Sequence, residues 1–128
     1  MSLDAIGIIS DDMDKSIEFY QCFGLDFELF GENEHAEALL PSGVRLMIDS
    51  KELMKKLYPA KEIKRGNSMV LCFKFETSSE LDERFQFLSE KKYSVLKSPE
   101  DMFWGQRYAS VEDPDGNQID LFCALREQ

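Results

Sequence analysis

Few side chains in this sequence could carry out acid–base or nucleophilic chemistry. The chain has one histidine, His35, and Glu37 follows it two positions later. Residues two apart on a strand face the same side, so this pair could share one surface. The more ordinary alternative is a rim histidine hydrogen-bonded to solvent or to a carboxylate.

The three cysteines, Cys22, Cys72 and Cys123, are far apart with no CxxC pair, which favours reduced thiols in the core. Nothing in the sequence places Cys72 beside His35 for nucleophilic catalysis.

Asp120 is the candidate catalytic residue, because the apolar side chains of Met47 and Val70 are expected beside it and could make it a buried acid–base group. The alternative is a carboxylate without a catalytic role, or one paired with Arg45. Arg45 and Arg107 could each bind a ligand carboxylate through two hydrogen bonds. Ordinary surface salt bridges are the commoner use of such arginines.

Large aromatic side chains gather near the C-terminal part of the chain. Phe103 and Trp104 lie in the segment SPEDMFWG, which we expect to be a loop. Exposed rings cost free energy unless they pack on the core, on a partner subunit or on a ligand. Tyr108 and Phe122 are expected to extend the surface formed by these two rings. The predicted ligand-binding set is Phe30, His35, Arg45, Met47, Phe103, Trp104, Tyr108 and Phe122.

The elements that must position these residues follow from the apolar patterns. The first half predicts a strand, a helix and three strands, at residues 3–10, 12–23, 25–31, 34–40 and 44–50. Residues 51–67 are basic and polar, and predict a short helix and a linker. The second half predicts a strand, a helix capped by Ser78 or Ser79, a short strand, a loop and a hairpin, at residues 69–77, 79–92, 93–97, 98–105 and 106–125.

The two halves also resemble each other in sequence. Residues 34–49 align without gaps on residues 107–122, so that Pro41 matches Pro114 and Gly43 matches Gly116. This internal duplication predicts one α+β domain, 1–128, built from two βαβββ modules. Module 1 spans about 3–50, the linker about 51–67, and module 2 about 68–125.

Alternation along the strands predicts which side chains lie opposite the helices. In the first module this set is Ala5, Gly7, Ile9, Arg45, Met47 and Asp49, with His35 and Glu37 added by repeat symmetry. In the second it is Val70, Cys72, Lys74, Tyr108, Ser110, Gln118, Asp120 and Phe122. One β-bulge would invert part of either set.

Three segments together resemble the glyoxalase/bleomycin-resistance/extradiol-dioxygenase superfamily, also called vicinal oxygen chelate proteins. They are DMDKSIEFYQCFGLDFEL, LLPSGVRLMID and WGQRYASVEDPDGNQIDLF, and the similarity covers about residues 3–125. The resemblance implies a curved mixed sheet around a cup, with helices on the convex face, and frequent homodimers. Some members of the superfamily use a divalent metal for isomerisation, thiol transfer or ring cleavage. Others bind an antibiotic without a metal.

The resemblance places the metal-ligand positions at Ala5, Met47, Val70 and Asp120. Alanine and valine have no donor and a thioether is soft, whereas a catalytic site normally needs about three protein ligands. We therefore expect no metal and no cofactor. A set of His35, Glu37 and Asp120 is the alternative.

The leading functional prediction is metal-free binding of a small aromatic or cationic ligand, as in antibiotic sequestration. One alternative is a lyase or dioxygenase that uses unusual metal ligands or Asp120 as its acid–base group. Another is a non-catalytic part of a regulatory assembly.

Charge and hydropathy narrow the possible partners. The 128 residues include 25 acidic and 15 basic side chains, for a formal net charge of −10. Such a chain repels phosphate backbones, so no nucleic-acid partner is expected. The apolar runs are too short to span a bilayer. The start MSLDAIGIIS has no basic region of the kind that begins a signal peptide, which predicts a cytoplasmic protein.

Overall fold

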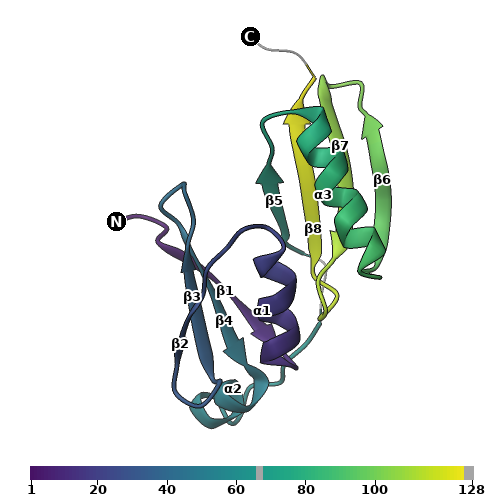
Figure 1. Cartoon of the computed structure of the whole chain (residues 1–128). Helices are drawn as coiled ribbons and strands as arrows, with labels where there is room; N and C mark the ends of the chain where they lie inside the picture. The colour runs from purple at the N-terminus through teal and green to yellow at the C-terminus, as the bar shows by residue number, and fades with distance from the viewer. Residues whose placement is uncertain (66–67, 126–128) are drawn as a thin grey trace. The chain divides into compact units, whose positions relative to one another are not determined.

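The computed structural model describes residues 1–65 and 68–125. The chain divides into two compact units, Met1–Lys64 and Arg65–Gln128, each with its own sheet (Figure 1). Together the described residues form two four-stranded mixed sheets and three helices. This confirms the predicted α+β fold of two βαβββ modules. No helix among the described residues is long and apolar enough to cross a membrane.

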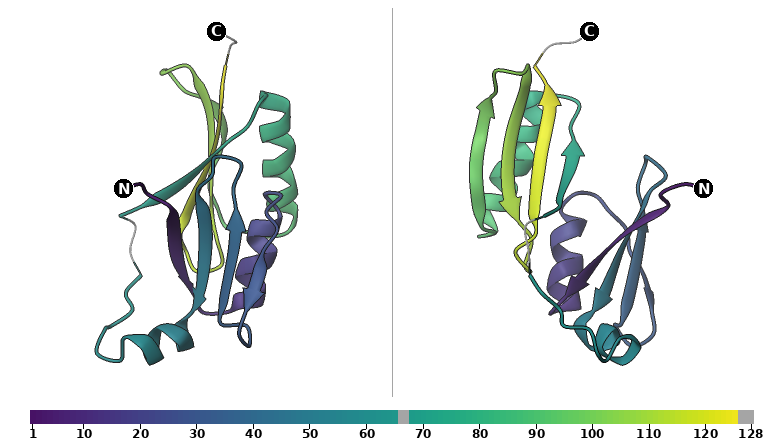
Figure 2. Two further views of the ribbon diagram at one scale, coloured as in Figure 1. Left: turned by 90° about the vertical axis from the view of Figure 1, so that its left-hand side faces the viewer. Right: turned by 180° about the vertical axis from the view of Figure 1, so that it is seen from behind.

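The first unit has the strand order β1-β4-β3-β2, with β1 parallel to β4 and the other pairs antiparallel. Helix α1 lies on one side of this sheet (Figure 2). Its elements are β1 (Ala5–Ser10), α1 (Met13–Gln21), β2 (Glu28–Phe30), β3 (His35–Leu39), β4 (Arg45–Ser50) and α2 (Lys51–Leu57).

Local sequence fixes the ends of α1 and its packing. The Asp12 side chain caps the helix by accepting a hydrogen bond from the backbone N–H of Lys15. Gly24, at a φ of 81°, follows the last turn in a conformation that favours glycine. Phe19 and Tyr20 are fully buried with their rings edge to face, at a centroid distance of 4.9 Å. The helix therefore covers one face of the sheet and leaves the other face uncovered by it.

The second unit repeats this plan with the order β5-β8-β7-β6, and β5 is parallel to β8. Helix α3 packs on β8 through Leu81, Phe85 and Leu88, which are buried. Thr77, rather than Ser78 or Ser79, caps this helix by accepting from the backbone N–H of Glu80. The elements are β5 (Val70–Lys74), α3 (Ser78–Glu90), β6 (Val95–Asp101), β7 (Gln106–Glu112) and β8 (Gln118–Ala124).

One predicted loop is partly wrong. Residues 98–105 were expected to form a loop, yet β6 continues through Asp101. Strand β6 is at the edge of its sheet, and its register against β7 is irregular between Val95, Lys97 and Glu100. An edge strand with such irregularities accommodates Pro99, because an edge residue need not donate to a neighbouring strand.

The turn between β7 and β8 sets the register of the second sheet. One carboxylate oxygen of Asp113 accepts hydrogen bonds from the backbone N–H groups of Asp115 and Asn117. Gly116 follows at a φ of 86°. In the resulting register Tyr108 pairs with Phe122, and Ser110 pairs with Asp120.

Candidate functional site

Each sheet has one face covered by its helix and a second face that we call the open face. In β4, Leu46 and Ile48 are buried on the helix side, whereas Arg45, Met47 and Asp49 alternate with them and are half-buried. A Cβ atom added to Gly7 would lie 3.5 Å from the Met47 Cε, which places these two residues on one face. In the second sheet the β7–β8 register pairs Tyr108 with Phe122 and Ser110 with Asp120, so the alternation predicted from sequence holds in both units.

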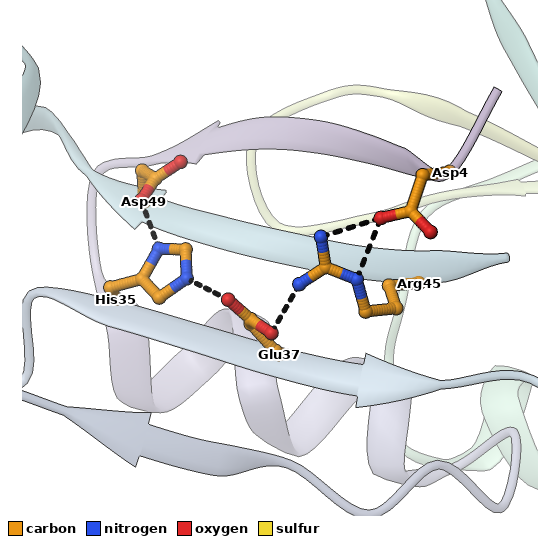
Figure 3. A network of polar contacts seen from close by, with 5 residues as sticks. All are labelled: Asp4, His35, Glu37, Arg45 and Asp49. Carbon is orange, nitrogen blue, oxygen red and sulfur yellow. Dashed lines mark hydrogen bonds and ion pairs between the residues drawn. The ribbon is translucent and has the colours of Figure 1, made fainter. Parts of the chain in front are cut away.

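The open face of the first sheet carries a chain of five polar side chains (Figure 3). The His35 Nδ1 is 2.5 Å from a carboxylate oxygen of Asp49, and its Nε2 is 2.7 Å from Glu37. The other Glu37 oxygen accepts from an Arg45 guanidinium nitrogen at 2.5 Å. The same guanidinium donates twice to Asp4, at 3.0 and 2.7 Å. We call these residues, Asp4, His35, Glu37, Arg45 and Asp49, the polar chain.

The contacts in the polar chain shift the titration of its members. Burial alone would lower the pKa of His35, but hydrogen bonds with Asp49 and Glu37 outweigh it and the pKa is raised. Hydrogen bonds from His35 and Arg45 lower the pKa of Glu37. Asp4 and Glu37 raise the pKa of Arg45. Arg45 is thus held by protein carboxylates, in agreement with the salt-bridge alternative for this residue.

Phe30 and Met47 lie on the same open face. Phe30 pairs with His35 in the β2–β3 register, and their ring centroids are 5.7 Å apart. This register puts Phe30 on the open face together with His35. The structure thus brings four predicted ligand-binding residues together in the first unit, namely Phe30, His35, Arg45 and Met47.

The open face of the second sheet carries a run of four aromatic rings, which we call the aromatic wall. Phe103 and Trp104 meet edge to face at 5.0 Å, and Trp104 meets Tyr108 in the same way at 5.6 Å. Tyr108 stacks on Phe122 at 5.8 Å. Phe103 is 94% exposed and Trp104 is 49% exposed. The predicted aromatic residues of module 2 therefore form one continuous surface whose outer end is uncovered.

Asp120 lies on this open face beside the aromatic wall, and its side chain is held on one side. One carboxylate oxygen accepts hydrogen bonds from Ser110 Oγ at 2.7 Å and from Gln118 Nε2 at 2.9 Å. The other oxygen is 4.0 Å from the Cys72 sulfur. Arg45, the other partner considered for Asp120, binds Asp4 and Glu37 within the first unit. The role of Gln118 escaped sequence reasoning, since strand alternation gave its face but not its partner.

Cys72 and Tyr108 complete the surroundings of Asp120. Burial and the Asp120 charge raise the pKa of Cys72, although a hydrogen bond with Tyr108 opposes this. Burial, followed by the charges of Cys72 and Asp120, raises the pKa of Tyr108. Both groups are therefore neutral near pH 7. The expectation of three core cysteines is wrong in part, since Cys123 is buried, Cys22 is half-buried and Cys72 is exposed.

Arg107 has a structural role on the opposite face of the second sheet. Its guanidinium donates to Asp82 of α3 at 2.8 Å and to Asp101 of β6 at 2.7 Å. These hydrogen bonds raise the pKa of Arg107 further above its ordinary value. The side chain joins α3 to β6 and β7, which agrees with the salt-bridge alternative rather than with ligand binding.

The donor set does not fit the divalent metal that some members of the resembled superfamily use. Ala5 and Val70 have no donor atom, and Met47 offers only a thioether, which suits soft ions. Asp120 is the one carboxylate, and one of its oxygens is already held by Ser110 and Gln118. Across residues 1–65 and 68–125, no group of three or more histidine, cysteine, aspartate or glutamate side chains is placed to hold a metal ion. The residues at these positions therefore do not fit a divalent metal.

Comparison with known families gives the class of the protein. The family model of the glyoxalase/bleomycin resistance protein/dioxygenase superfamily matches residues 2–121. The chain belongs to this superfamily. A search of curated proteins found no match to the sequence.

Solved structures share the fold at low sequence identity. A glyoxalase/bleomycin resistance protein/dioxygenase family enzyme from Burkholderia phytofirmans is 17% identical with a TM-score of 0.86, covering 98% of this chain and 100% of that one. A glyoxalase-related enzyme from Fulvimarina pelagi is 20% identical with a TM-score of 0.83, covering 95% and 87%. A lactoylglutathione lyase from Agrobacterium tumefaciens is 17% identical with a TM-score of 0.72, covering 95% and 92%. At these identities the likeness establishes the fold alone, since one fold supports many functions.

Proposed function

We propose that this protein binds a small, flat, cationic organic molecule against the aromatic wall of the second sheet, without a metal. The observation that carries the proposal is the run of four rings from Phe122 to Phe103, whose outer member is 94% exposed. Exposed aromatic surface of this kind is costly in water and is used where a partner covers it. A flat ligand stacked on the wall would remove that cost.

Charge favours a cation as the ligand. Asp120 lies between Cys72 and Ser110 in the sheet register, next to the Tyr108–Phe122 pair. Among the contacts described above, the second carboxylate oxygen of Asp120 has only the neutral Cys72 thiol as a neighbour, and no cation. The formal net charge of −10 adds a long-range attraction for cations. Sequestration of an antibiotic fits these properties, and the superfamily to which the chain belongs includes bleomycin resistance proteins.

Trp104 provides a direct test, because it is the only tryptophan in the chain. Titration with a cationic, aromatic glycopeptide antibiotic of the bleomycin class is expected to change its fluorescence with saturation at micromolar ligand. The Phe103→Ala variant is expected to bind about tenfold more weakly, which corresponds to roughly 1.4 kcal/mol of lost ring contact. Asp120→Asn is expected to lower the affinity for a cationic ligand and to leave the affinity for a neutral aromatic analogue unchanged.

Phe87→Ala is the matched control, because Phe87 is an exposed phenylalanine on helix α3 of the same unit. It is expected to bind like the parent protein. A flat fluorescence signal up to high micromolar antibiotic would exclude this ligand class. Light scattering during the titration separates ligand binding from self-association. A dimer mass that falls to the monomer mass in Phe103→Ala would assign the aromatic wall to a subunit contact instead.

The alternative of a lyase or dioxygenase has less support, because the donor set lacks the ligands for a metal. A metal-independent reaction with Asp120 as the acid–base group would require turnover that Asp120→Asn abolishes. The homodimer and the cytoplasmic location expected from the sequence belong to the same proposal, and light scattering of the purified chain tests the first of them.

A further inference from the structure

The polar chain of the first unit contains a histidine with a carboxylate at each ring nitrogen (Figure 3). A neutral imidazole carries one N–H donor and one lone pair, whereas an ionised carboxylate can only accept. The contacts of His35 with Asp49 and Glu37 can therefore both be hydrogen bonds only when both ring nitrogens carry a proton. The geometry thus selects the imidazolium form of His35.

We propose that His35 is a proton-operated clamp of the first sheet, which joins β3 to β4 when charged and releases one of its two carboxylates when it loses a proton. His35 and Glu37 belong to β3, and Asp49 belongs to β4. Glu37 also accepts a hydrogen bond from Arg45 of β4. Arg45 in turn binds Asp4, the residue immediately before β1. The clamp therefore connects β3, β4 and the residue that precedes β1.

The groups around His35 favour its charged form. Three carboxylates of the polar chain, Asp4, Glu37 and Asp49, face two cations when His35 is charged and one when it is neutral. Glu28 of β2 pairs with Glu37 and adds a further negative charge on the same face. Glu34, which precedes His35, is ion-paired at 3.1 Å with Lys56 of α2. Strand β1 presents only Ala5, Gly7 and Ile9 to this face, so it contributes no charge.

The direction of the pH dependence follows from linkage. The pKa of His35 is raised in the folded protein above its ordinary value of 6.5. Its stabilising contribution is therefore fully present below about pH 6.5 and is lost as the pH rises through the folded pKa. The pKa of Glu37 is lowered, so its contribution is present above its ordinary value of 4.5 and is lost in acid. The clamp is therefore closed from about pH 4.5 up to the folded pKa of His35, and it opens when the pH rises above that pKa.

The first experiment follows the histidine itself. Because His35 is the only histidine, the imidazole signals in an NMR titration of the full chain belong to it alone. The midpoint is expected above 6.5, and Asp49→Asn and Glu37→Gln are each expected to lower it. Asp82→Asn, which removes a carboxylate from the Arg107 contact in the second unit, is the matched control and should leave the midpoint unchanged. A midpoint at or below 6.5 in the parent protein would overturn the proposal.

The second experiment tests whether the proton controls the sheet. Backbone amide signals of β3 and β4 are expected to shift with the same midpoint as the imidazole, and the resistance of the first unit to urea is expected to fall as the pH rises through that midpoint. His35→Gln should remove both effects. If the amide shifts and the loss of stability persist in His35→Gln, the clamp is wrong. If His35→Gln does not fold, the titration of the parent protein and of the two carboxylate variants still decides.

Discussion

At the scale of single residues, Cys72 offers a sharp test of the environment of Asp120. Burial and the Asp120 charge raise the pKa of this thiol, and the thiolate is the form that reacts. We expect slow alkylation of Cys72 by iodoacetamide near pH 7 despite its exposure, with a steep rise in alkaline buffer. Asp120→Asn should increase the rate at pH 8, because it removes the neighbouring negative charge. Mass spectrometry of the Cys72 peptide measures this.

Cys22 is the internal control for that experiment, because it belongs to the first unit and has no contact with Asp120 among those described. Its rate should be the same in the parent protein and in Asp120→Asn. Equal Cys72 rates in the two proteins would show that Asp120 does not control the thiol.

Sequence reasoning predicted the faces of residues better than their partners. Strand alternation placed His35, Arg45 and Asp120 on the faces opposite the helices, because side chains on a strand alternate regardless of the neighbouring strands. The pairing of Arg45 with Asp4 and Glu37 could not be predicted in this way, since it depends on the register between β1, β4 and β3.

At the scale of elements, helix α3 is expected to hold the second unit together through its buried leucines. Leu81 is 0% exposed, and its replacement by alanine should cost about 2–5 kcal/mol of unfolding free energy. Urea denaturation followed by circular dichroism measures the loss. Glu83→Ala, at an exposed position two residues later on the same helix, should change stability by only about 0.5 kcal/mol or less. Similar effects from both variants would contradict the packing described for α3.

In strand β6 the local sequence pattern predicted the wrong structure for residues 98–101. Ser98, Pro99 and Glu100 have the composition of a loop, and each local signal favoured a turn. The neighbouring strand β7 overrides this preference, because Glu100 and Asp101 pair with it beyond Pro99. The positions of α1 and α3 were predicted correctly because their apolar spacing is strong, whereas Thr77 caps α3 in place of the predicted Ser78 or Ser79.

At the scale of the whole molecule, the two units repeat one topology but differ in the chemistry of their open faces. The first presents the charged polar chain, and the second presents the aromatic wall with Asp120. The sequence indicates a duplication through the match of Pro41 with Pro114. The two units thus share their strands and turns, but not the side chains on their open faces. Functional inference must therefore rest on each face separately rather than on the shared fold.

The metal content of the whole protein is the last prediction, and it separates binding from metal-dependent catalysis. A tightly held divalent ion needs about three protein ligands, and the positions that resemble the superfamily ligands offer only the Asp120 carboxylate and the Met47 thioether. Protein purified without chelator should therefore contain well below one equivalent of zinc, iron or manganese by plasma mass spectrometry. Its thermal midpoint should not change in EDTA, because a ligand that binds only the folded state would raise that midpoint. One ion per chain that survives gel filtration, together with a midpoint that EDTA lowers, would contradict the metal-free proposal and favour a lyase or dioxygenase.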